Sequence, residues 1–471
     1  MNHMVFQTEK AIGLCLCLYL GFSPAVIRAQ GGRNYSLKDY SDSAQRHLPV
    51  LLEKKAQVNA ARAGVTDARH RYLPTTYLAD QVTIGTDNSM AGSYLSLGII
   101  PSSSSGVKSA NVYQSAAGNI GILSGEYELV NFGLKQATIR NAEAYENLSV
   151  ADLEREGYLL KWQVGKLYFD ILKSRLQLAV DSQNIYRYAT MDAIVLALTR
   201  SGIRAGADSA LALAELSKTR TSYNQTLGQL RQQEQELSYL SGIGMDRIGV
   251  DTSQAANYQS TLALLGQGVR LDTANNPLIA YYARQELLHI SQEDLVRKSY
   301  LPKILLTGTT WARGSSIDYI GNYNSLASGW GYQRFNYLGG LTFVYDLFNG
   351  VHRRDRLTIS HNETLASDFA WKQQTLSLAN IGNQADEAIH TSEVNLAEVP
   401  VQVSAAESAF SQKSAQYRAG IINLVDLTDA SFVLYRAQSD YIQALSDWLL
   451  ANLDRAAASG YLDSFIQSIK N

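Results

Sequence analysis

Cysteine is nearly absent from this sequence. The 471 residues include two cysteines, Cys15 and Cys17, and both lie in an apolar run at residues 11–22. This run is too short to span a bilayer and precedes a small-residue site ending at Ala29, which predicts a secretory signal peptide over residues 1–29. The mature chain then has no cysteine. Because disulfides cannot stabilise it, a large packed assembly is favoured over a small secreted scaffold.

The sequence also lacks an excess of charge of either sign. Its formal net charge is −2, and it has neither a basic patch nor a block of like charges, so nucleic acid is not a predicted partner. The seven histidines are scattered, and there is no HExxH pair, Walker loop or Rossmann glycine loop. We therefore predict no catalytic residue, no cofactor and no metal site, and we do not expect an enzyme.

Proline is scarce, and its few positions are informative. Among seven prolines, Pro49 and Pro74 lie 25 residues apart, and Pro277 and Pro302 repeat that spacing 228 residues later. Proline is tolerated in the first turn of a helix and ends or kinks a helix elsewhere. Each pair is therefore predicted to bracket one helix, and the chain to contain this arrangement twice.

A second pair of matching segments supports a duplication. Residues 200–203 (Arg-Ser-Gly-Ile) match residues 418–421 (Arg-Ala-Gly-Ile), and Asp208 matches Asp426, all at an offset of 218. The glycine in each segment supplies the backbone freedom that a turn between two helices needs. We interpret the chain as an internal duplication.

The two repeats divide the mature chain. We predict a first structural repeat at residues 30–240, a Gly-, Ser- and Asp-rich linker at 241–275 and a second repeat at 276–471. Each repeat contains a helix, a β-hairpin, a long helix and a return helix. The expected ranges of the last three elements are 73–131, 133–199 and 208–240 in the first repeat, and 301–349, 350–416 and 424–459 in the second.

Both hairpins are rich in Tyr, Thr, Ser and Gly. Before each long helix, apolar or aromatic residues recur at every other position, as at Leu123 and Tyr127 or at Tyr337 and Leu341, while the opposite face carries polar residues such as Glu126. Such alternation, with aromatic residues near the strand ends, is typical of a membrane β-barrel wall. A half-buried hairpin of a soluble protein fits the same alternation, so the strands alone leave both interpretations open.

Two proline-poor segments predict unusually long helices. Residues 133–199 contain no proline and are rich in Ala, Leu, Glu, Lys and Gln, so one helix there would reach roughly 100 Å. Residues 350–416 have the same length but contain Pro400, where we expect a kink or a break. The return helices carry heptad repeats in which one stripe has large side chains and the other has small ones. This pattern predicts antiparallel coiled-coil packing.

The expected elements do not complete a membrane structure within one chain. Four strands cannot close a barrel, and open strand edges cannot lie in lipid. A membrane-spanning form must therefore be an oligomer, and three chains would supply twelve strands around one axis. The predicted fold is mainly α-helical, with long antiparallel helices forming a coiled-coil barrel and four β-strands per chain contributing to a twelve-stranded trimeric membrane β-barrel.

With these features, the mature chain resembles the TolC-type outer membrane efflux channel family over essentially its full length. The resemblance rests on the paired prolines, on the Tyr-acid-Leu-x-Asn sequences at 127–131 and 345–349, and on the Tyr-x-x-Gly and Asp-x-x-Asp motifs at 417–420 and 426–429. It implies a homotrimer with a barrel in outer-membrane lipid and a long helical barrel in the periplasm. It also implies contacts with a periplasmic membrane-fusion (adaptor) protein and an inner-membrane transporter.

The same resemblance assigns roles to the helix-to-helix turns. It implies that Asp426 and Asp429 line a periplasmic aperture, where three chains would stack two acidic rings that favour cations. Gly202 and Gly420 would form the tip turns. The aspartates also have a local explanation, since acidic residues in a first helical turn are favoured by the helix dipole and by capping in any protein.

One position departs from the family pattern. Family members often carry an arginine two residues after the turn glycine, where it latches the closed state, and this chain has Ile422 there. The candidate gating latch is therefore assigned to Tyr417, to Arg204 at the equivalent position of the first repeat, and to Asp208. The alternative for Arg204 is an ordinary solvated arginine.

The predicted function is that of a passive exit duct. A trimeric channel would conduct cargo from an inner-membrane transporter across the periplasm and the outer membrane, in tripartite efflux or type I secretion. Drugs, metal ions and secreted proteins all stay open as cargo because the partners select it. The alternative is an exported coiled-coil structural or adhesive surface protein without channel activity.

Overall fold

The computed structural model describes four parts of the chain. They are residues 35–88, 107–203, 205–252 and 276–469. The predicted signal peptide, most of the predicted linker and the latch candidate Arg204 lie outside these residues.

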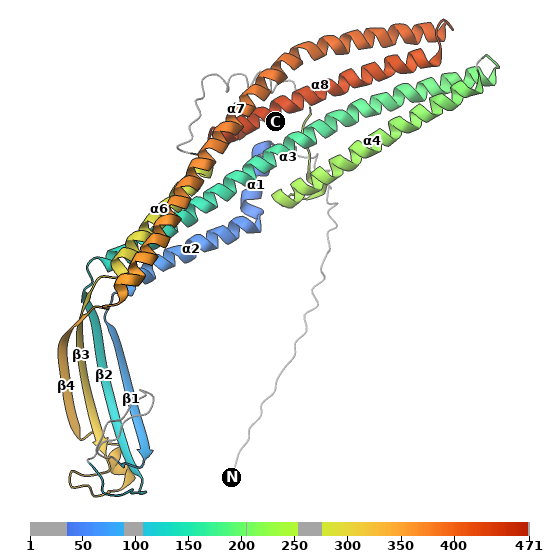
Figure 1. Ribbon diagram of the computed structural model, residues 1–471. Helices are drawn as coiled ribbons and strands as arrows, with labels where there is room; N and C mark the ends of the chain where they lie inside the picture. The colour runs from blue at the N-terminus through green and yellow to red at the C-terminus, as the bar shows by residue number, and fades with distance from the viewer. Residues whose placement is uncertain (1–34, 89–106, 204, 253–275, 470–471) are drawn as a thin grey trace, which may run out of the picture.

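The described chain is mainly helical, with one four-stranded sheet at the end opposite the helical tips (Figure 1). No described helix combines the length and the apolar character needed to cross a membrane. The predicted mainly helical, internally duplicated fold with four strands is confirmed. In chain order the elements are α1 (Leu37–His47), α2 (Pro49–His70), β1 (Thr75–Gly85), β2 (Ala116–Val130), α3 (Leu134–Arg200), α4 (Gly206–Ser241), the 3-10 helix η1 (Met245–Arg247), α6 (Pro277–Ser299), β3 (Lys303–Ser315), the 3-10 helix η2 (Leu326–Gly329), β4 (Arg334–Val344), α7 (Asn349–Arg418), α8 (Leu424–Ala458) and α9 (Leu462–Ser468).

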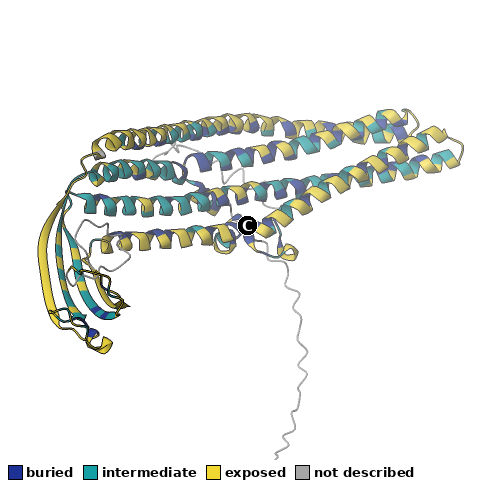
Figure 2. Cartoon of the chain, turned by 60° about the horizontal axis from the view of Figure 1, so that its bottom comes forward, coloured by how far each residue is buried: buried dark blue, intermediate teal, exposed yellow. Residues whose placement is uncertain are grey.

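The sheet joins the two repeats. Its strand order is β1-β2-β3-β4, and every neighbouring pair is antiparallel. The central pair brings β2 of the first repeat against β3 of the second, so the hairpins form one continuous sheet. β1 and β4 are left as the two edges, and β4 is exposed along its whole length (Figure 2).

The register gives the sheet two unlike faces. Leu78, Leu123 and Tyr337 share one face through successive pairings, and their side chains are 80%, 51% and 90% exposed. The opposite face carries a hydrogen bond between the hydroxyls of Ser124 and Thr309, 2.8 Å apart. One face is therefore apolar and uncovered, while the other holds polar contacts.

The main core lies where α1, α3 and α9 meet, near the middle of the helical part. A chain of aromatic contacts runs from Tyr40 through Tyr168 and Phe169 to Phe465, with ring centroids 5.7–6.2 Å apart. The Tyr40 hydroxyl also donates to the carbonyl of Gly249 and accepts from its N–H, at 3.2 and 3.0 Å. Burial raises the pKa of Tyr40 to about 12. These contacts attach the start of the predicted linker to the core.

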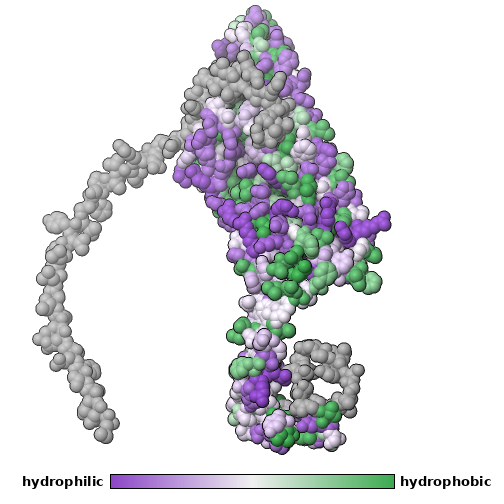
Figure 3. Space-filling model, turned by 90° about the vertical axis from the view of Figure 1, so that its left-hand side faces the viewer, coloured by the Kyte–Doolittle hydropathy of each residue, from purple (hydrophilic) through white to green (hydrophobic). Residues whose placement is uncertain are grey.

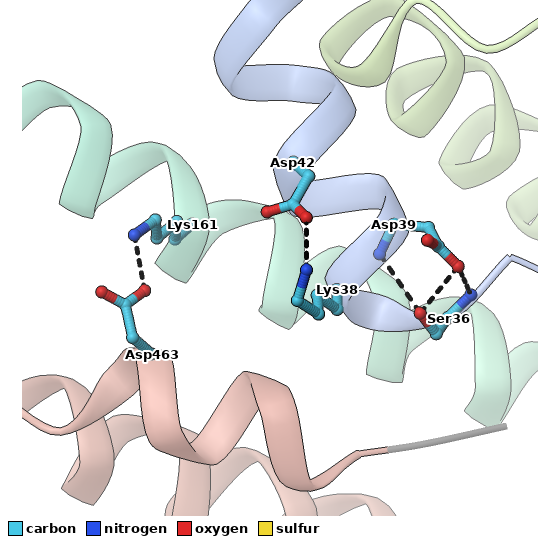
Figure 4. Close-up of polar contacts among 6 residues, drawn as sticks. All are labelled: Ser36, Lys38, Asp39, Asp42, Lys161 and Asp463. Atoms are coloured by element: carbon cyan, nitrogen blue, oxygen red, sulfur yellow. Dashed lines mark hydrogen bonds and ion pairs between the residues drawn. The ribbon is translucent and has the colours of Figure 1, made fainter.

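Helix α1 precedes the helix that Pro49 and Pro74 bracket, and it was not predicted from the sequence. Its start is a capping box in which Ser36 Oγ accepts the N–H of Asp39 at 3.2 Å and the Asp39 carboxylate accepts the N–H of Ser36 at 3.0 Å (Figure 4). The same view shows Lys161 of α3 paired with Asp463 of α9. A Ser-x-x-Asp signal was present in the sequence and could have revealed this helix.

Of the kink or break expected at Pro400, a break is excluded, because α7 continues through this residue from Asn349 to Arg418. Proline removes one N–H donor, but the helix is held on both sides of it. Val399 is buried, and Ala406 is buried against Leu434 and Ala437 of α8. Packing along the paired helix therefore maintains a local arrangement that an isolated helix would disfavour.

A buried carboxylate connects three helices between the main core and the turns that join α3 to α4 and α7 to α8. Asp181 of α3 is 2% exposed and accepts hydrogen bonds from Gln177 of its own helix, Thr226 of α4 and Tyr435 of α8, at 2.9, 2.7 and 2.9 Å. Burial raises the pKa of Tyr435, so its hydroxyl stays a proton donor. The network ties the α3–α4 hairpin to α8 through one acceptor.

We expect Asp181→Ala to destabilise the folded protein strongly. The change leaves three donors without their acceptor, and each buried unsatisfied group costs roughly 1–3 kcal/mol. The measurement is the thermal unfolding midpoint of the purified protein. Asp192→Ala is the control, since Asp192 lies on the same helix and is half-exposed. Equal midpoints for the two variants would contradict a structural role for the network.

Candidate functional site

The candidate site is the end of the helical part farthest from the strands, where two helix-to-helix turns lie (Figure 1). The first turn connects α3 to α4, and the second connects α7 to α8. The helix pairs α3–α4 and α7–α8, here called the helical hairpins, both extend to this end, and α3 packs against α8. The tip is therefore built by both repeats.

The two turns have the same backbone geometry. Gly202 and Gly420 have φ of 74° and 76°, in the left-handed region that glycine adopts without strain. The N–H of Ile203 donates to the carbonyl of Leu198, and that of Ile421 donates to the carbonyl of Gln416, each at 3.0 Å. These are the six-to-one bonds of a Schellman motif, which uses otherwise unpaired helix carbonyls.

The space around the turn glycines is open. A Cβ placed on Gly202 or Gly420 would meet no atom within 4 Å. A side chain there is therefore opposed by the backbone conformation alone, without a steric clash. A substitution at either glycine therefore tests the backbone conformation of the turn without disturbing the packing of the tip.

Helix α8 begins with a side-chain cap. The side-chain oxygen of Asn423 accepts the N–H of Asp426 at 2.8 Å. Asp426 lies in the first turn and is half-exposed, and Asp429 follows one turn later and is exposed. Neither carboxylate forms an ion pair with the described residues. Both side chains are thus open to solvent in the single chain.

The first repeat starts its return helix differently. The N-cap of α4 is Ala205, which offers no side-chain cap, and Asp208 lies in the first turn. Asp208 is half-exposed and occupies the place that Asp426 has in the second repeat. The capping arrangement of Asn423 therefore belongs to the second repeat alone.

An apolar cluster holds the two helical hairpins, α3–α4 and α7–α8, together at the tip. Tyr417, the latch candidate from α7, is buried in it and 2% exposed. Ile422 is partly buried against the same cluster. The remaining buried members come from α3, α4 and α8: Tyr188, Met191, Val195, Ala212, Leu216, Leu424 and Leu427. Ile422, two residues after the turn glycine, therefore makes an apolar contact.

Asp429 acts electrostatically on one member of the cluster, Tyr188. Burial raises the pKa of Tyr188, and the negative charge of Asp429 contributes to the same shift. Asp429 of α8 thus lies close enough to α3 to affect the pKa of Tyr188. The structure brings Tyr417 and the α8 aspartates to one end of the molecule, together with Ala212, which lies one turn after Asp208.

Sequence reasoning missed several residues that shape this region. The heptad pattern indicated apolar faces on the return helices, but it did not predict that Tyr188 and Tyr417 share a core, and Asp181 was not identified. A heptad pattern shows which face of a helix is apolar, whereas these contacts cross between repeats. Within the described ranges, no three His, Cys, Asp or Glu side chains are placed to hold a metal ion.

Comparison with known proteins connects this architecture to one family. A sequence model of the family described as "outer membrane efflux protein" matches residues 40–243 and 269–460. No curated protein sequence matches the chain significantly.

Solved structures share the fold at low sequence identity. The outer-membrane channel OprN is 16% identical, with 90% of this chain and 89% of that chain covered and a TM-score of 0.71. The outer membrane protein VceC of Vibrio cholerae is 13% identical, with 90% and 96% covered and a TM-score of 0.72. The Campylobacter jejuni CmeC outer membrane channel is 14% identical, with 92% and 89% covered and a TM-score of 0.70.

Proposed function

The chain belongs to the outer membrane efflux protein family, and we propose that three copies form a passive exit duct of a multicomponent export system. Membership makes the protein an outer membrane efflux channel that extends into the periplasm, and not an enzyme. The trimeric state, the route of export and the roles of the tip residues are the proposed part.

The observation that carries the proposal is the pair of free sheet edges. Among the described residues, β1 and β4 each have one neighbouring strand, so the backbone groups on their outer sides have no strand partner there. Unpaired backbone groups are costly in lipid, and a closed barrel removes them. Two further copies would pair β4 of each chain with β1 of the next, giving twelve strands.

The helices supply the length of the duct. α3 has 67 residues and α7 has 70, so each extends roughly 100 Å at the rise of an α-helix. The long helices of three copies would continue the barrel as a helical tube. Such a tube carries cargo without chemistry of its own, which fits a passive role.

The tip would form the periplasmic aperture. Asp426 and Asp429 of three chains would make two acidic rings about 4.5 Å apart along the axis. Tyr417, Asp208 and Arg204 are the proposed latch residues. We propose that the apolar contact of Ile422 takes over part of the closing function of the arginine found in other members.

We further propose that a signal peptide over residues 1–29 directs export, and that the tip meets a periplasmic adaptor protein and an inner-membrane transporter. Tripartite efflux and type I secretion both use such an exit duct. The membrane assignment disfavours the alternative of a surface coiled-coil protein without channel activity.

Conductance of the purified protein in a planar bilayer, together with chemical cross-linking, tests the proposal. We expect a cross-linked trimer that produces small, cation-selective current steps. Insertion as a monomer or a dimer would contradict the closure of a twelve-stranded barrel. A trimer with large, unselective steps would retain the duct but refute the acidic aperture.

A further inference from the structure

The junction between β4 and α7 exposes apolar side chains next to cations. Leu347, Phe348 and Val351 are 82%, 84% and 71% exposed. Arg353, Arg354 and Arg356 follow within the first turns of α7, and all three are exposed. We call these six residues the junction surface.

The three arginines have no partners in the described chain. None of their guanidinium groups forms an ion pair or a hydrogen bond with the described residues. Asp355 lies among them and is also exposed, so residues 351–356 keep a net charge of +2. In a single chain the surface is therefore positively charged and exposed.

Other cations near the strand ends are arranged differently. Several lie at the end of α2, the start of α3, the end of α6 and the start of β3, and each pairs with a carboxylate at 2.7–3.1 Å. They are Arg69, Arg71, Arg140, Arg297 and Lys303. These five cations are thus neutralised, in contrast to the arginines of α7, whereas Lys135 and Lys298 also form no ion pair with the described residues.

The start of α7 already has an anion beside it. Its N-cap, Phe348, provides no side-chain hydrogen bond, but the Asp346 carboxylate accepts the N–H of Phe348 at 3.0 Å. The helix dipole acts over the first turn of a helix, and Arg353, Arg354 and Arg356 lie beyond it. The helix start itself therefore makes no use of the three arginines.

The internal repeat provides a comparison within the same molecule. At an offset of 218, Arg353, Arg354 and Arg356 correspond to Lys135, Gln136 and Thr138 of α3. The Lys135 ammonium lies over the ring of Tyr72, 5.6 Å from its centroid. A strand-to-helix junction of this kind forms without the three arginines, so the repeat fold does not require them.

The position of this surface matches a membrane boundary. The strands lie in the outer membrane and the helices in the periplasm, and the arginines lie about 5–10 Å along α7 from its first residue. Each headgroup layer of a bilayer is roughly 5–8 Å thick. In Figure 3, hydrophobic side chains gather where the helical part meets the strands, with a band of hydrophilic side chains directly above.

We propose that the junction surface binds an anionic phospholipid of the periplasmic leaflet. Leu347, Phe348 and Val351 would contact the acyl-chain boundary, and the arginines would bind the headgroup phosphate. Arginine suits this ligand because its planar donors fit phosphate oxygens, and basic groups beside a membrane surface select anionic lipids. The inference rests on the membrane placement of the strands and is independent of conduction.

Native mass spectrometry of the detergent-purified trimer tests the proposal. The probe is phosphatidylglycerol, with phosphatidylcholine as the zwitterionic comparison. We expect the wild-type protein to bind phosphatidylglycerol about tenfold more tightly than phosphatidylcholine, and this preference to weaken as salt is raised. The variant R353Q/R354Q/R356Q should lose the preference, whereas the corresponding triple lysine variant should keep most of it.

The control variant removes equal charge far from the membrane. R220Q/R231Q/R247Q changes three exposed arginines of α4 and η1 and should bind both lipids as the wild type does. Equal binding of the two lipids by the wild type would overturn the proposal. So would an unchanged preference in the triple glutamine variant. If that variant fails to form trimers, the single variant R354Q is measured, and an unaltered preference there would also overturn it.

Discussion

Replacing Asp426 and Asp429 by alanine is expected to reduce the cation selectivity of the channel. In the proposed trimer, two rings of three carboxylates would concentrate cations and repel anions at the aperture. An interaction of about 1 kcal/mol between a permeating ion and a nearby solvated charge corresponds to roughly a fivefold change in the cation-to-anion permeability ratio. The measurement is the reversal potential in a salt gradient, together with the strength of block by multivalent cations.

Single variants separate the aperture role from the local role of the aspartates. Asp426 lies in the first turn of α8, so Asp426→Ala also removes a favourable interaction with the helix dipole, worth roughly 0.3–1 kcal/mol. Asp429 lies one turn later and is exposed. Asp429→Ala should therefore change selectivity while leaving the unfolding midpoint nearly unchanged.

Two aspartates farther from the tip along α8 provide a matched control. Asp440 and Asp447 belong to the same helix, and their replacement by alanine removes the same charge away from the tip. We expect that variant to keep the wild-type permeability ratio. If Asp426→Ala/Asp429→Ala also keeps it, the aspartates do not line the constriction, and capping alone explains them.

Gly420→Val is expected to impair export while the protein still inserts as a trimer. The residue has φ of 76°, where a side chain costs roughly 1–2 kcal/mol, and a β-branched one costs more. Because a Cβ at this position has no atom within 4 Å, the cost falls on the turn and not on tip packing. The measurements are export by cells that depend on this chain, and the amount of membrane-inserted trimer.

Gly228→Ala is the control for the Gly420 variant. Gly228 lies inside α4 and also has open space around it, but its backbone is helical. Alanine there should stabilise the helix by roughly 1 kcal/mol and leave export unchanged. Loss of membrane insertion by Gly420→Val would show that the turn serves folding rather than gating.

Local features of the fold were accessible from the sequence because they depend on neighbouring residues. The turn glycines at 202 and 420 have the left-handed backbone that their sequence context predicts. The alternation near Leu123 and Tyr337 produced strands whose apolar residues share a face. The capping box at Ser36 was equally local and was overlooked. Pro400 shows the limit of local rules, since packing against α8 maintains a helix that proline disfavours.

The duplication, the mainly helical class, the strands and the position of the turns could be predicted from the sequence, because each depends on spacing along the chain. Which apolar faces meet could not be predicted in this way, and the fold shows it. It paired β2 with β3, buried Tyr417 between the hairpins and placed Asp181 among donors from three helices. Periodicity identifies a face but not its partner, since contacts between residues more than 150 positions apart depend on how the whole chain packs.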